Sequence, residues 1–313
     1  MRVLVTGATG FLGHRLTERL VEAGCGVVGL TRSPEGAARL EALGAVGIVG
    51  DLREPAEQLA AHLRRAAPEV VVHLAAELAT QRSARRLHEV DVVGTRHLVD
   101  ACLEIRGRHG YPYRLLYAGT VVVGDPLGAV LSPTAPLVAT TAYGRAKLEA
   151  EALCLSAARA GIGVTVLRPS HIYGAGGWYG DVVRDLRRGR FFVPGHGDNL
   201  WDLVHVDDAV EAFLLAFHAG AATNGEIFHV VDDTPLTMRE FFDATADALE
   251  VPRPSSVPVW LAKLVRGAGP VAAAVRSARS SNASLKRRLG WSPLWPDARL
   301  GLREAVATLL AVS

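Results

Sequence analysis

Short apolar runs alternate with amphipathic helical patterns along the first half of the chain. The apolar runs predict six strands, at Val3–Val5, Gly26–Leu30, Val46–Val49, Val70–Leu74, Arg114–Tyr117 and Gly163–Leu167. Between them, apolar positions recur at helical spacing and predict helices at Leu12–Ala23, Pro34–Leu43, Ala56–Ala67, Ala84–Arg108 and Tyr143–Ala160. This alternation indicates an α/β fold, in which a parallel sheet carries helices on both faces.

The second half of the chain is less regular. Glycines at Gly174–Gly177 and Gly195–Gly197 predict loops, Asp207–Phe217 a helix and Ile227–Val231 a strand, and the residues from Pro235 onward predict further helices. We expect residues 1–170 to form one domain to which 203–231 return. Residues 171–202 and 232–313 would form a smaller substrate-binding lobe. Ligands of such sheets bind at the carboxyl ends of the strands, so the site is expected between the lobes.

Three glycines follow the first strand at three-residue spacing: Gly7, Gly10 and Gly13. The first two let the backbone approach a pyrophosphate, and the third lets the helix pack closely on the strand. Free N–H groups at the helix N-terminus would supply an anion site. The motif therefore predicts that residues 1–170 are a dinucleotide-binding domain, with an ordinary glycine turn as the alternative. The expected cofactor contacts in this segment are Gly7, Thr9, Gly10, Phe11, Leu12 and Gly13.

Arg32 and Ser33 end the second strand, where dinucleotide folds meet the adenosine ribose. An acidic residue there selects NAD, whereas an arginine accommodates the 2′-phosphate of NADP. The two residues therefore predict NADP(H) rather than NAD(H), with a plain surface arginine as the alternative. Further cofactor contacts are expected at the ends of the third and fourth strands: Asp51, Leu52, Leu74, Ala75 and Ala76.

Tyr143 and Lys147 lie four residues apart and therefore share one helix face. A nearby ammonium favours tyrosinate, so Lys147 is expected to lower the pKa of Tyr143 toward working pH. Tyr143 could then exchange a proton with a carbonyl oxygen, and Lys147 could also hold the nicotinamide ribose. The alternative is a chance pair on an exposed helix.

Together these motifs resemble an extended short-chain dehydrogenase/reductase of the NAD(P)-dependent epimerase/dehydratase-like superfamily. The resemblance implies a Rossmann-type doubly wound parallel sheet and an enzyme that uses a nicotinamide cofactor, and it leaves the substrate open. The matching segments span most of the chain: Thr6–Gly13, Gly50–Leu52, His73–Ala76, Gly94-Thr95, Gly124, Tyr143–Lys147, Arg168-Pro169, Ile172-Tyr173-Gly174 and His205–Asp208.

The chain departs from the family pattern at two positions. Members usually carry a Ser or Thr five residues before the glycine that is Gly124 here, and that position is Gly119. Thr120 could supply the catalytic hydroxyl only if the chain is already turning, because adjacent strand residues point to opposite faces. Asp91 stands where the family usually has Asn, and an ionised Asp cannot donate a hydrogen bond.

The resemblance places Pro169 and His171 over the nicotinamide. His171 is equally open to substrate contact and to structural packing. Nucleotide-sugar members often carry a diphosphate-binding Arg where this chain has Trp201, which argues against that substrate class. The expected substrate contacts are Thr120, Val121, His171, Trp178 and Trp201. For His205–Asp208, a helix cap by Asp207 or Asp208 is preferred over a catalytic His–Asp pair.

Net charge and cysteine content restrict the partners, the metal chemistry and the cellular compartment that are expected. The formal net charge of +2 offers no electrostatic case for nucleic acid. Three separated cysteines, Cys25, Cys102 and Cys154, favour a reducing compartment and argue against disulfides or a metal site. The first strand begins at the N-terminus, so no signal peptide is expected and the predicted location is the cytoplasm.

Two stretches stay ambiguous. Residues 257–275 are apolar but interrupted by Pro, Gly, Lys and Arg, so no membrane span is expected; helices of the core or lobe are preferred over contact with a membrane surface. Arg184, Arg187, Arg188 and Arg190 form a basic run, which is a solvated helix face or a phosphate contact.

The sequence therefore predicts an NADP(H)-dependent oxidoreductase that interconverts a carbonyl and an alcohol in a small organic substrate, with Tyr143 as acid/base, Lys147 beside it and Thr120 as hydroxyl donor. One alternative is a sugar epimerase or dehydratase that retains its cofactor. Another is a non-catalytic dinucleotide-binding sensor or scaffold. A homodimer is left open.

Overall fold

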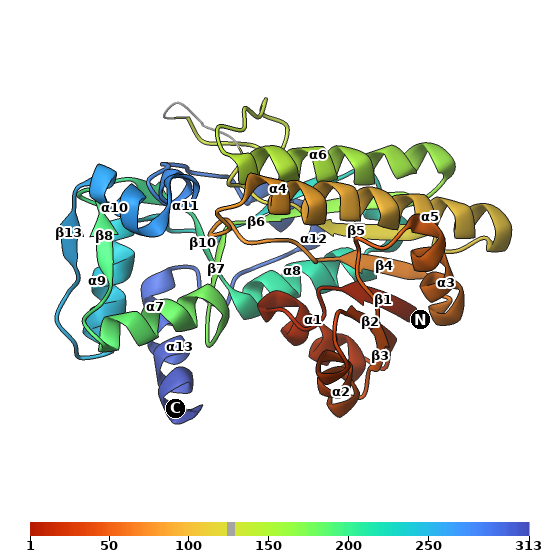
Figure 1. The fold of residues 1–313 in the computed structure, drawn as a ribbon, viewed down its shortest axis with the longest axis horizontal. Helices are drawn as coiled ribbons and strands as arrows, with labels where there is room; N and C mark the ends of the chain where they lie inside the picture. Colours follow the sequence, from red (N-terminus) through yellow and green to blue (C-terminus); the bar gives the residue numbers. More distant parts are fainter. Residues whose placement is uncertain (124–128, 313) are drawn as a thin grey trace.

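A computed structural model describes residues 1–123 and 129–312, and its centre is a seven-stranded parallel sheet (Figure 1). The strand order is β11-β6-β5-β4-β1-β2-β3. The predicted α/β fold and its six N-terminal strands are confirmed. The strands are β1 Arg2–Thr6, β2 Gly26–Thr31, β3 Val46–Val49, β4 Val70–His73, β5 Arg114–Ala118, β6 Gly163–Pro169 and β11 Ile227–Val230.

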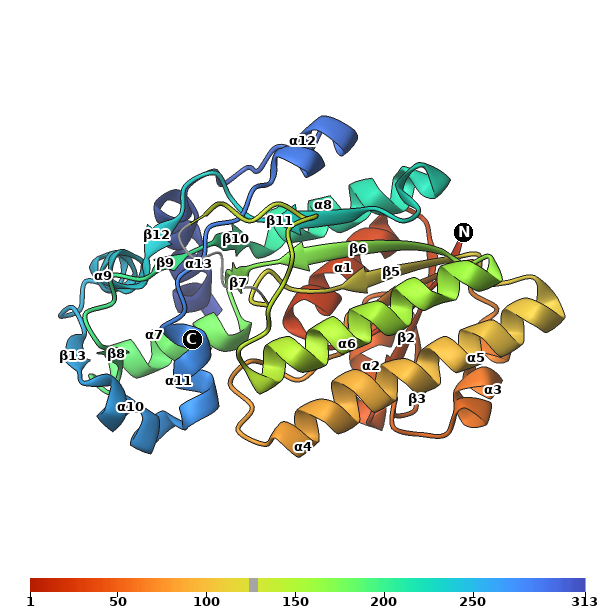
Figure 2. The same cartoon turned by 90° about the horizontal axis from the view of Figure 1, so that it is seen from above.

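Helices cover both faces of this sheet, as Figure 2 shows from above. The helices are α1 Phe11–Glu22, α2 Pro34–Ala42, α3 Ala56–Ala66, α5 Gly94–His109, α6 Ala142–Ser156 and α8 Val206–His218. Successive strand residues point to opposite faces, so Val3 and Val5 pack with α1 and α8, whereas Leu4 packs with α3, α5 and α6. Burial on both faces explains why the strands read as continuous apolar runs.

The single helix predicted over Ala84–Arg108 is interrupted. The structure has α4 at Ala84–Leu87, a π-helical segment at His88–Val93 and then α5. Such segments insert an extra residue per turn and occur frequently at functional sites. Periodicity alone could not reveal this one, although it carries Asp91.

The remaining elements form a smaller part at the left of Figure 1, with its own apolar core. Its helices are α7 Gly177–Arg187, α9 Met238–Ala248, α10 Val259–Arg266, α11 Ala268–Ala274 and α13 Ala298–Val312, and α12 Ala283–Leu289 packs against β11 and α8. Strands pair as β7 His171–Tyr173 with β10 Leu203–His205, β8 Phe192–Pro194 with β13 Ser255–Val257, and β9 Leu200–Trp201 with β12 Leu236–Thr237. Only the end of helix α7 was predicted, through the solvated helix face expected for the basic run, and Arg184 and Arg187 do lie in its last turn. The division of the chain at the expected boundaries stays a prediction.

The cap of α8 differs from the expectation. His205 is the N-cap residue, and its Nδ1 accepts from the Asp207 N–H at 3.3 Å. Asp207 instead pairs with Arg15 at 2.6 Å, and Asp208 accepts from the backbone of Leu294 and Trp295. The preferred scaffold role of this segment therefore holds, with a different residue as the cap.

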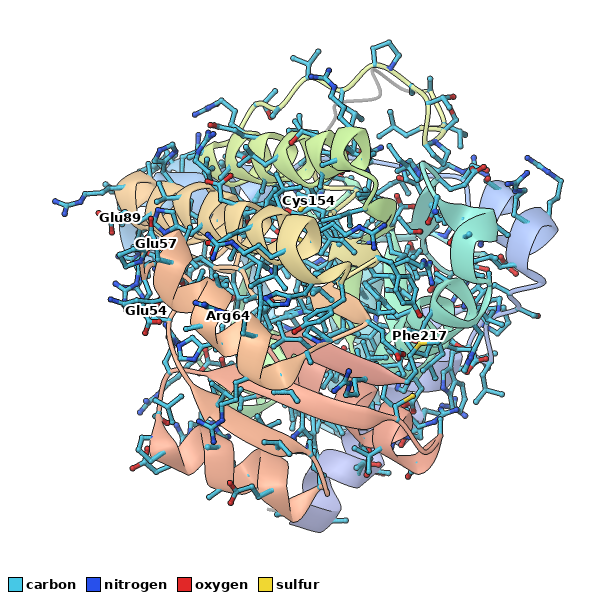
Figure 3. The ribbon with its side chains drawn as sticks, turned by 90° about the vertical axis from the view of Figure 1, so that its right-hand side faces the viewer. Glu54, Glu57, Arg64, Glu89, Cys154 and Phe217 are labelled. Atoms are coloured by element: carbon cyan, nitrogen blue, oxygen red, sulfur yellow. The ribbon has the colours of Figure 1, made fainter. Side chains whose placement is uncertain are left out.

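The three cysteines are free thiols. Cys102 and Cys154 are buried, and Cys154, labelled in Figure 3, lies near the end of α6. Burial raises the pKa of Cys102 to about 12, so that thiol is inert. Among the described residues, no group of His, Cys, Asp and Glu could hold a metal, and no helix is long and apolar enough to cross a membrane.

Candidate active site

A cavity of about 750 Å³ lies at the carboxyl ends of the parallel strands, where the topology places a ligand. Residues far apart in sequence meet here. They include the glycine-rich turn, the ends of β2, β4, β5 and β6, the start of α6, and part of α11. Most predicted site residues line this cavity: Gly7, Thr9, Gly10, Phe11, Leu12, Gly13, Arg32, Asp51, Leu52, Leu74, Ala75, Ala76, Thr120, Tyr143, Lys147, Pro169, His171, Trp178 and Trp201.

The glycine-rich turn joins β1 to α1 through positions at which a side chain would not fit. Gly7 has φ +71°, and an added Cβ would lie 2.7 Å from the Ala75 nitrogen. At Gly13 a Cβ would lie 2.1 Å from the Gly7 oxygen, so this glycine sets the close packing of helix on strand. Gly10 is the N-cap and has no side chain to satisfy the first N–H groups, which leaves them for an anion.

A buried hydrogen-bond chain ties the cavity floor together. The Thr95 hydroxyl donates to the Asp91 carbonyl oxygen, so its oxygen accepts from Nε2 of His73 at 2.9 Å. Nδ1 of His73 then accepts from the Thr6 hydroxyl at 2.7 Å. Burial lowers the pKa of His73 to about 3, so the ring is neutral, as this chain requires. The arrangement fixes the ends of β1 and β4 against each other.

Arg32 is exposed at the edge of the cavity and therefore accessible to a phosphate. The nearby Asp51 carboxylate is held by Arg53 at 2.6 Å, and this pairing lowers the pKa of Asp51. Ser33 does not line the cavity. It caps α2, accepting from the Gly36 N–H at 3.1 Å.

Tyr143 and Lys147 enter the cavity from the first turns of α6. Thr141 caps this helix by accepting from the Gly144 N–H at 3.0 Å. Lys147 is buried, and its Nζ donates to the Ala118 carbonyl at 2.7 Å. The same Nζ lies 4.7 Å from the centre of the Tyr117 ring.

The expected lowering of the Tyr143 pKa is wrong for this structure. Burial raises the pKa of Tyr143, the Asp91 charge raises it further, and a hydrogen bond with Thr120 opposes both. Lys147 is not among the groups that lower this pKa, and its Nζ donates to the Ala118 carbonyl. The phenol is therefore protonated at neutral pH, which is the state that donates a proton to a carbonyl oxygen.

Thr120 lies beside Tyr143 because β5 ends at Ala118 and the chain is already turning. Its Oγ1 also accepts from the Val122 N–H at 3.1 Å. Gly119 faces the other way. A Cβ added there would lie 2.9 Å from Cγ of Arg168 and within 3.0 Å of the Glu151 carboxylate. A hydroxyl at position 119 would thus point away from the cavity, whereas the one on Thr120 is in contact with the phenol. Gly124, which the family comparison used, lies outside the described residues.

Asp91 serves as a hydrogen-bond acceptor for the backbone. Its Oδ1 accepts from the Glu77 N–H at 2.7 Å, and an Asn carbonyl could make the same bond. Among the described residues nothing hydrogen-bonds its buried Oδ2. Burial raises the pKa of Asp91 to about 6, and Lys147 opposes that rise.

His171 both packs and lines the cavity. Its ring stacks on Trp201 with centroids 4.2 Å apart and planes at 7°, and Nδ1 lies 3.1 Å from the Asp202 carbonyl. A carbonyl only accepts, so Nδ1 carries the hydrogen. Burial lowers the pKa of His171 to about 4, so the ring is neutral and Nε2 is an acceptor.

Two differences from the sequence prediction concern the substrate end. Val121 does not line the cavity; it packs in a small cluster with Val122, Val231 and Tyr143. The prediction missed several apolar residues that do: Leu78, Pro270, Ala273 and Ala274. The run of small and apolar residues within 257–275 was the sequence signal that could have indicated Pro270, Ala273 and Ala274. Among the described residues of the lining, Arg32 and Lys147 are the only Lys or Arg.

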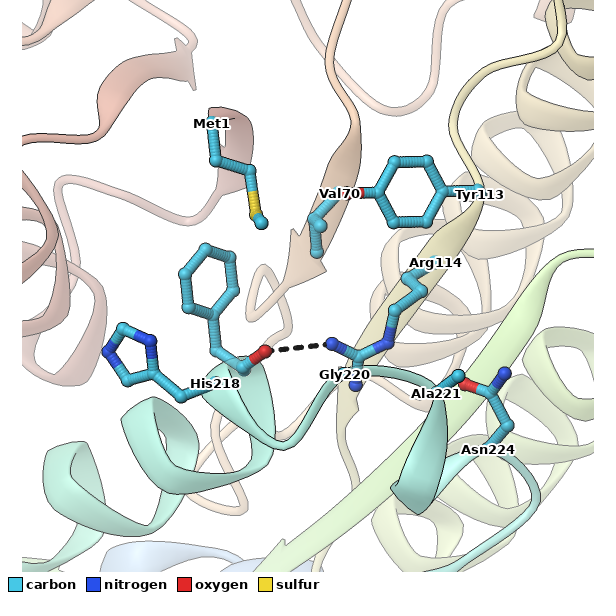
Figure 4. A pocket seen from close by; sticks show the side chains of 9 residues that line it. Met1, Val70, Tyr113, Arg114, His218, Gly220, Ala221 and Asn224 are labelled. Atoms are coloured by element: carbon cyan, nitrogen blue, oxygen red, sulfur yellow. Dashed lines mark hydrogen bonds between the residues drawn. The ribbon is translucent and has the colours of Figure 1, made fainter.

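A second cavity, of about 350 Å³, lies near the opposite edge of the sheet, by the amino ends of β4 and β5 (Figure 4). Arg114 is buried beside it and donates to the carbonyls of Phe217 and Ala216 and to Thr223. These contacts satisfy the C-terminal carbonyls of α8 with a cation, which the helix dipole favours. Arg114 therefore serves the fold.

Comparison with known proteins agrees with this geometry. The family described as "NAD dependent epimerase/dehydratase family" matches residues 3–230. The chain is 34% identical over 272 residues to a 2-alkyl-3-oxoalkanoate reductase of Stenotrophomonas maltophilia, covering 81% of this chain and 77% of the relative. It is 31% identical to a 3-diazoavenalumate denitrifying reductase of a Streptomyces species, covering 96% of this chain and 99% of the relative.

The fold also matches a solved structure, that of UDP-glucose 4-epimerase from Thermotoga maritima with UDP-glucose. The TM-score is 0.85, and the match covers 100% of this chain and 99% of the epimerase. Sequence identity is 23%, so this likeness establishes the fold and does not extend to the substrate.

Proposed function

This chain belongs to the NAD dependent epimerase/dehydratase family, within the extended short-chain dehydrogenases/reductases, and we propose that it is an NADP(H)-dependent ketoreductase for substrates with a large apolar group. It is an oxidoreductase of that superfamily. One observation carries the finer proposal: the protonated Tyr143 and the Thr120 hydroxyl face a cavity whose substrate end is apolar.

The residues present fit a dinucleotide. The glycine-rich turn offers its N–H groups to the pyrophosphate, and Lys147 lies near enough to the cavity to hold the ribose. When bound, the reduced nicotinamide supplies hydride to the carbonyl carbon. Tyr143 donates its phenolic proton to the carbonyl oxygen, and Thr120 stabilises the negative charge that develops there. The ketone thereby becomes an alcohol.

The lining favours an apolar ketone over a nucleotide sugar. A diphosphate is usually held by arginine or lysine, and the described lining offers none beyond Arg32 and Lys147. Trp178 and Trp201 present aromatic surface instead, beside Ala273 and Ala274. Neutral His171 adds one acceptor for a substrate hydroxyl or N–H. A 2-alkyl-3-oxoalkanoate, the substrate named for the Stenotrophomonas relative, suits this composition.

Substrate turnover tests the proposal. We expect purified protein to consume NADPH with long-chain 3-oxoalkanoates in proportion to alcohol formed, and to leave UDP-glucose unchanged. The epimerase alternative, which the family includes, predicts conversion of a sugar nucleotide without net change in nicotinamide absorbance. Cofactor binding without turnover of any carbonyl or sugar would favour the sensor or scaffold alternative.

The NADP(H) preference rests on Arg32. We expect Arg32→Ala to weaken NADPH binding by about 1.5–3 kcal/mol, the range for hydrogen bonds to charged groups, while NADH binding hardly changes. Titration calorimetry with both cofactors measures this. Arg53→Ala is the matched control, because Arg53 pairs with Asp51 and does not line the cavity. Equal losses for both cofactors in Arg32→Ala, or tighter wild-type binding of NADH, would contradict the preference.

We also propose a cytoplasmic location and keep the two-lobe division with boundaries near residues 170, 203 and 231. The three cysteines, which are all free thiols, support a reducing compartment. Cell fractionation tests the location, and light scattering tests whether the protein is a homodimer.

A further inference from the structure

Helix α10 leaves an apolar surface uncovered. Trp260 is 65% exposed, Leu264 73% and Val265 52%, and Leu261 is also exposed. In this eight-residue helix only Ala262 is buried. The four exposed residues occur at spacings of one and four, so they share one side of the helix. We call them the α10 patch. A contiguous apolar patch of this kind marks an interaction surface.

Cations surround the α10 patch. Lys263 lies within the same helix, and Arg82 reaches its end, where it donates to the Val265 carbonyl at 2.7 Å. Arg266 lies over the rings of Phe191 and Phe192, which brings the basic run ending at Arg190 to the same end. Within the described part of the chain, Arg82, Lys263 and Arg190 form no ion pair with a carboxylate, although Arg266 pairs with Asp185.

The charge bias extends well beyond this helix. Residues 251–296 contain eight Lys or Arg and no Asp or Glu, whereas the whole chain has a net charge of only +2. The rest of the chain is therefore net acidic. Three of the eight cations belong to α12, which packs against β11 and α8, so the attraction of an anionic surface to α10 comes from the cations around the α10 patch itself.

The α10 patch is connected to the cavity. Helices α10 and α11 pack against each other and lie side by side in both Figure 1 and Figure 2. From α11, Pro270, Ala273 and Ala274 line the cavity, and Leu78 does so while 58% exposed. An apolar surface that binds α10 would thus lie next to the apolar end of the site.

We propose that α10 docks the protein peripherally on an anionic phospholipid surface. The α10 patch would enter the boundary between headgroups and acyl chains, with Trp260 at the interface, and Lys263, Arg82 and Arg190 would meet lipid phosphates. A lipid surface fits better than a second copy of this chain, because self-association through α10 would bring two copies of the cations around the α10 patch, Lys263, Arg82 and Arg190, close to each other. An eight-residue helix is too short to span the bilayer, so the attachment is reversible.

Vesicle binding by the full chain tests this without any substrate, so its outcome is separate from that of the ketoreductase proposal. We expect co-sedimentation with phosphatidylcholine vesicles that contain phosphatidylserine, weaker binding to pure phosphatidylcholine, and release at high salt. Trp260 is the most exposed of the tryptophans. Vesicles should therefore shift the tryptophan fluorescence emission to the blue, and Trp260→Phe should remove most of that shift.

Matched substitutions separate this surface from general effects. Leu264→Asp should weaken vesicle binding about tenfold or more, because an apolar anchor becomes an anion. Leu294→Asp, at a leucine that is 70% exposed elsewhere, should change binding little. Lys263→Glu should weaken binding more than Arg287→Glu, which makes the same change of net charge at an exposed site in α12.

Three results would overturn the proposal: no binding of the wild-type protein to phosphatidylserine vesicles, equal losses in Leu264→Asp and Leu294→Asp, or no salt dependence. Light scattering provides the remaining check. Concentration-dependent dimers that Leu264→Asp dissolves, without vesicle binding, would assign α10 to self-association instead.

Discussion

Tyr143→Phe is expected to lower ketone reduction by roughly 10²–10⁴-fold, the usual size of general acid–base catalysis. The change removes one hydroxyl from a buried ring and leaves the ring's packing in place. Burial keeps the phenol protonated at neutral pH, so the variant lacks the proton donor that we propose. Cofactor binding should survive, because the glycine-rich turn and Lys147 remain. Steady-state turnover with NADPH, together with cofactor titration, measures both effects.

Tyr117→Phe is the matched control. Tyr117 is also buried and its ring lies 4.7 Å from the same Lys147 ammonium, yet it does not line the cavity. Its hydroxyl makes one long bond, 3.4 Å to the Lys147 carbonyl. We expect turnover to change only a few-fold in this variant. Near-normal activity in Tyr143→Phe, or equal losses in the two variants, would show that another group is the acid.

Thr120→Val is expected to lower turnover because it raises the activation free energy by about 2.7–4 kcal/mol, the cost of removing a donor from a preorganised oxyanion site. Valine keeps the shape of threonine and loses the hydroxyl that contacts Tyr143. It also leaves the Val122 N–H without its acceptor, so some stability should be lost as well. Thr120→Ser retains the hydroxyl and should keep most of the activity. Measuring turnover beside the free energy of unfolding separates the two effects.

Gly119→Ser completes this comparison. If position 119 were a missing catalytic hydroxyl, serine there would raise turnover. The structure leads to the opposite expectation. The added Cβ would meet the buried Arg168–Glu151 pair, whose atoms approach to 2.6 Å, and overpacking of this kind costs about 1–3 kcal/mol of stability. A gain in turnover from Gly119→Ser with no loss in Thr120→Val would refute the assignment of Thr120.

The glycine-rich turn is a feature that local sequence was sufficient to predict. A strand, three spaced glycines and an amphipathic helix each have a short-range signature, and their order requires the dinucleotide topology. The role proposed for Gly13 from its spacing matches the 2.1 Å approach that a Cβ would make to the Gly7 oxygen. The sheet, the glycine-rich turn, the position of the cavity and the Tyr143–Lys147 pair were therefore predictable.

The direction of the Tyr143 pKa shift could not be predicted from local sequence. Four-residue spacing correctly placed Tyr143 and Lys147 on one helix face, but it led to the wrong direction for the Tyr143 pKa. That direction depends on how completely the phenol is enclosed and on the neighbouring Asp91 and Thr120 side chains. Burial and long-range partners are properties of the packed molecule.

The sequence by itself determined the family, the order of strands and helices, and which motifs lie at the carboxyl edge of the sheet, because all of these follow from local periodicity and short motifs. The tertiary structure alone decided that Thr120 rather than position 119 meets Tyr143, that Asp91 needs only to accept, and that α11 closes the apolar end of the cavity. Side-chain direction after a strand ends, enclosure from water and contacts between distant segments arise only when the chain is packed.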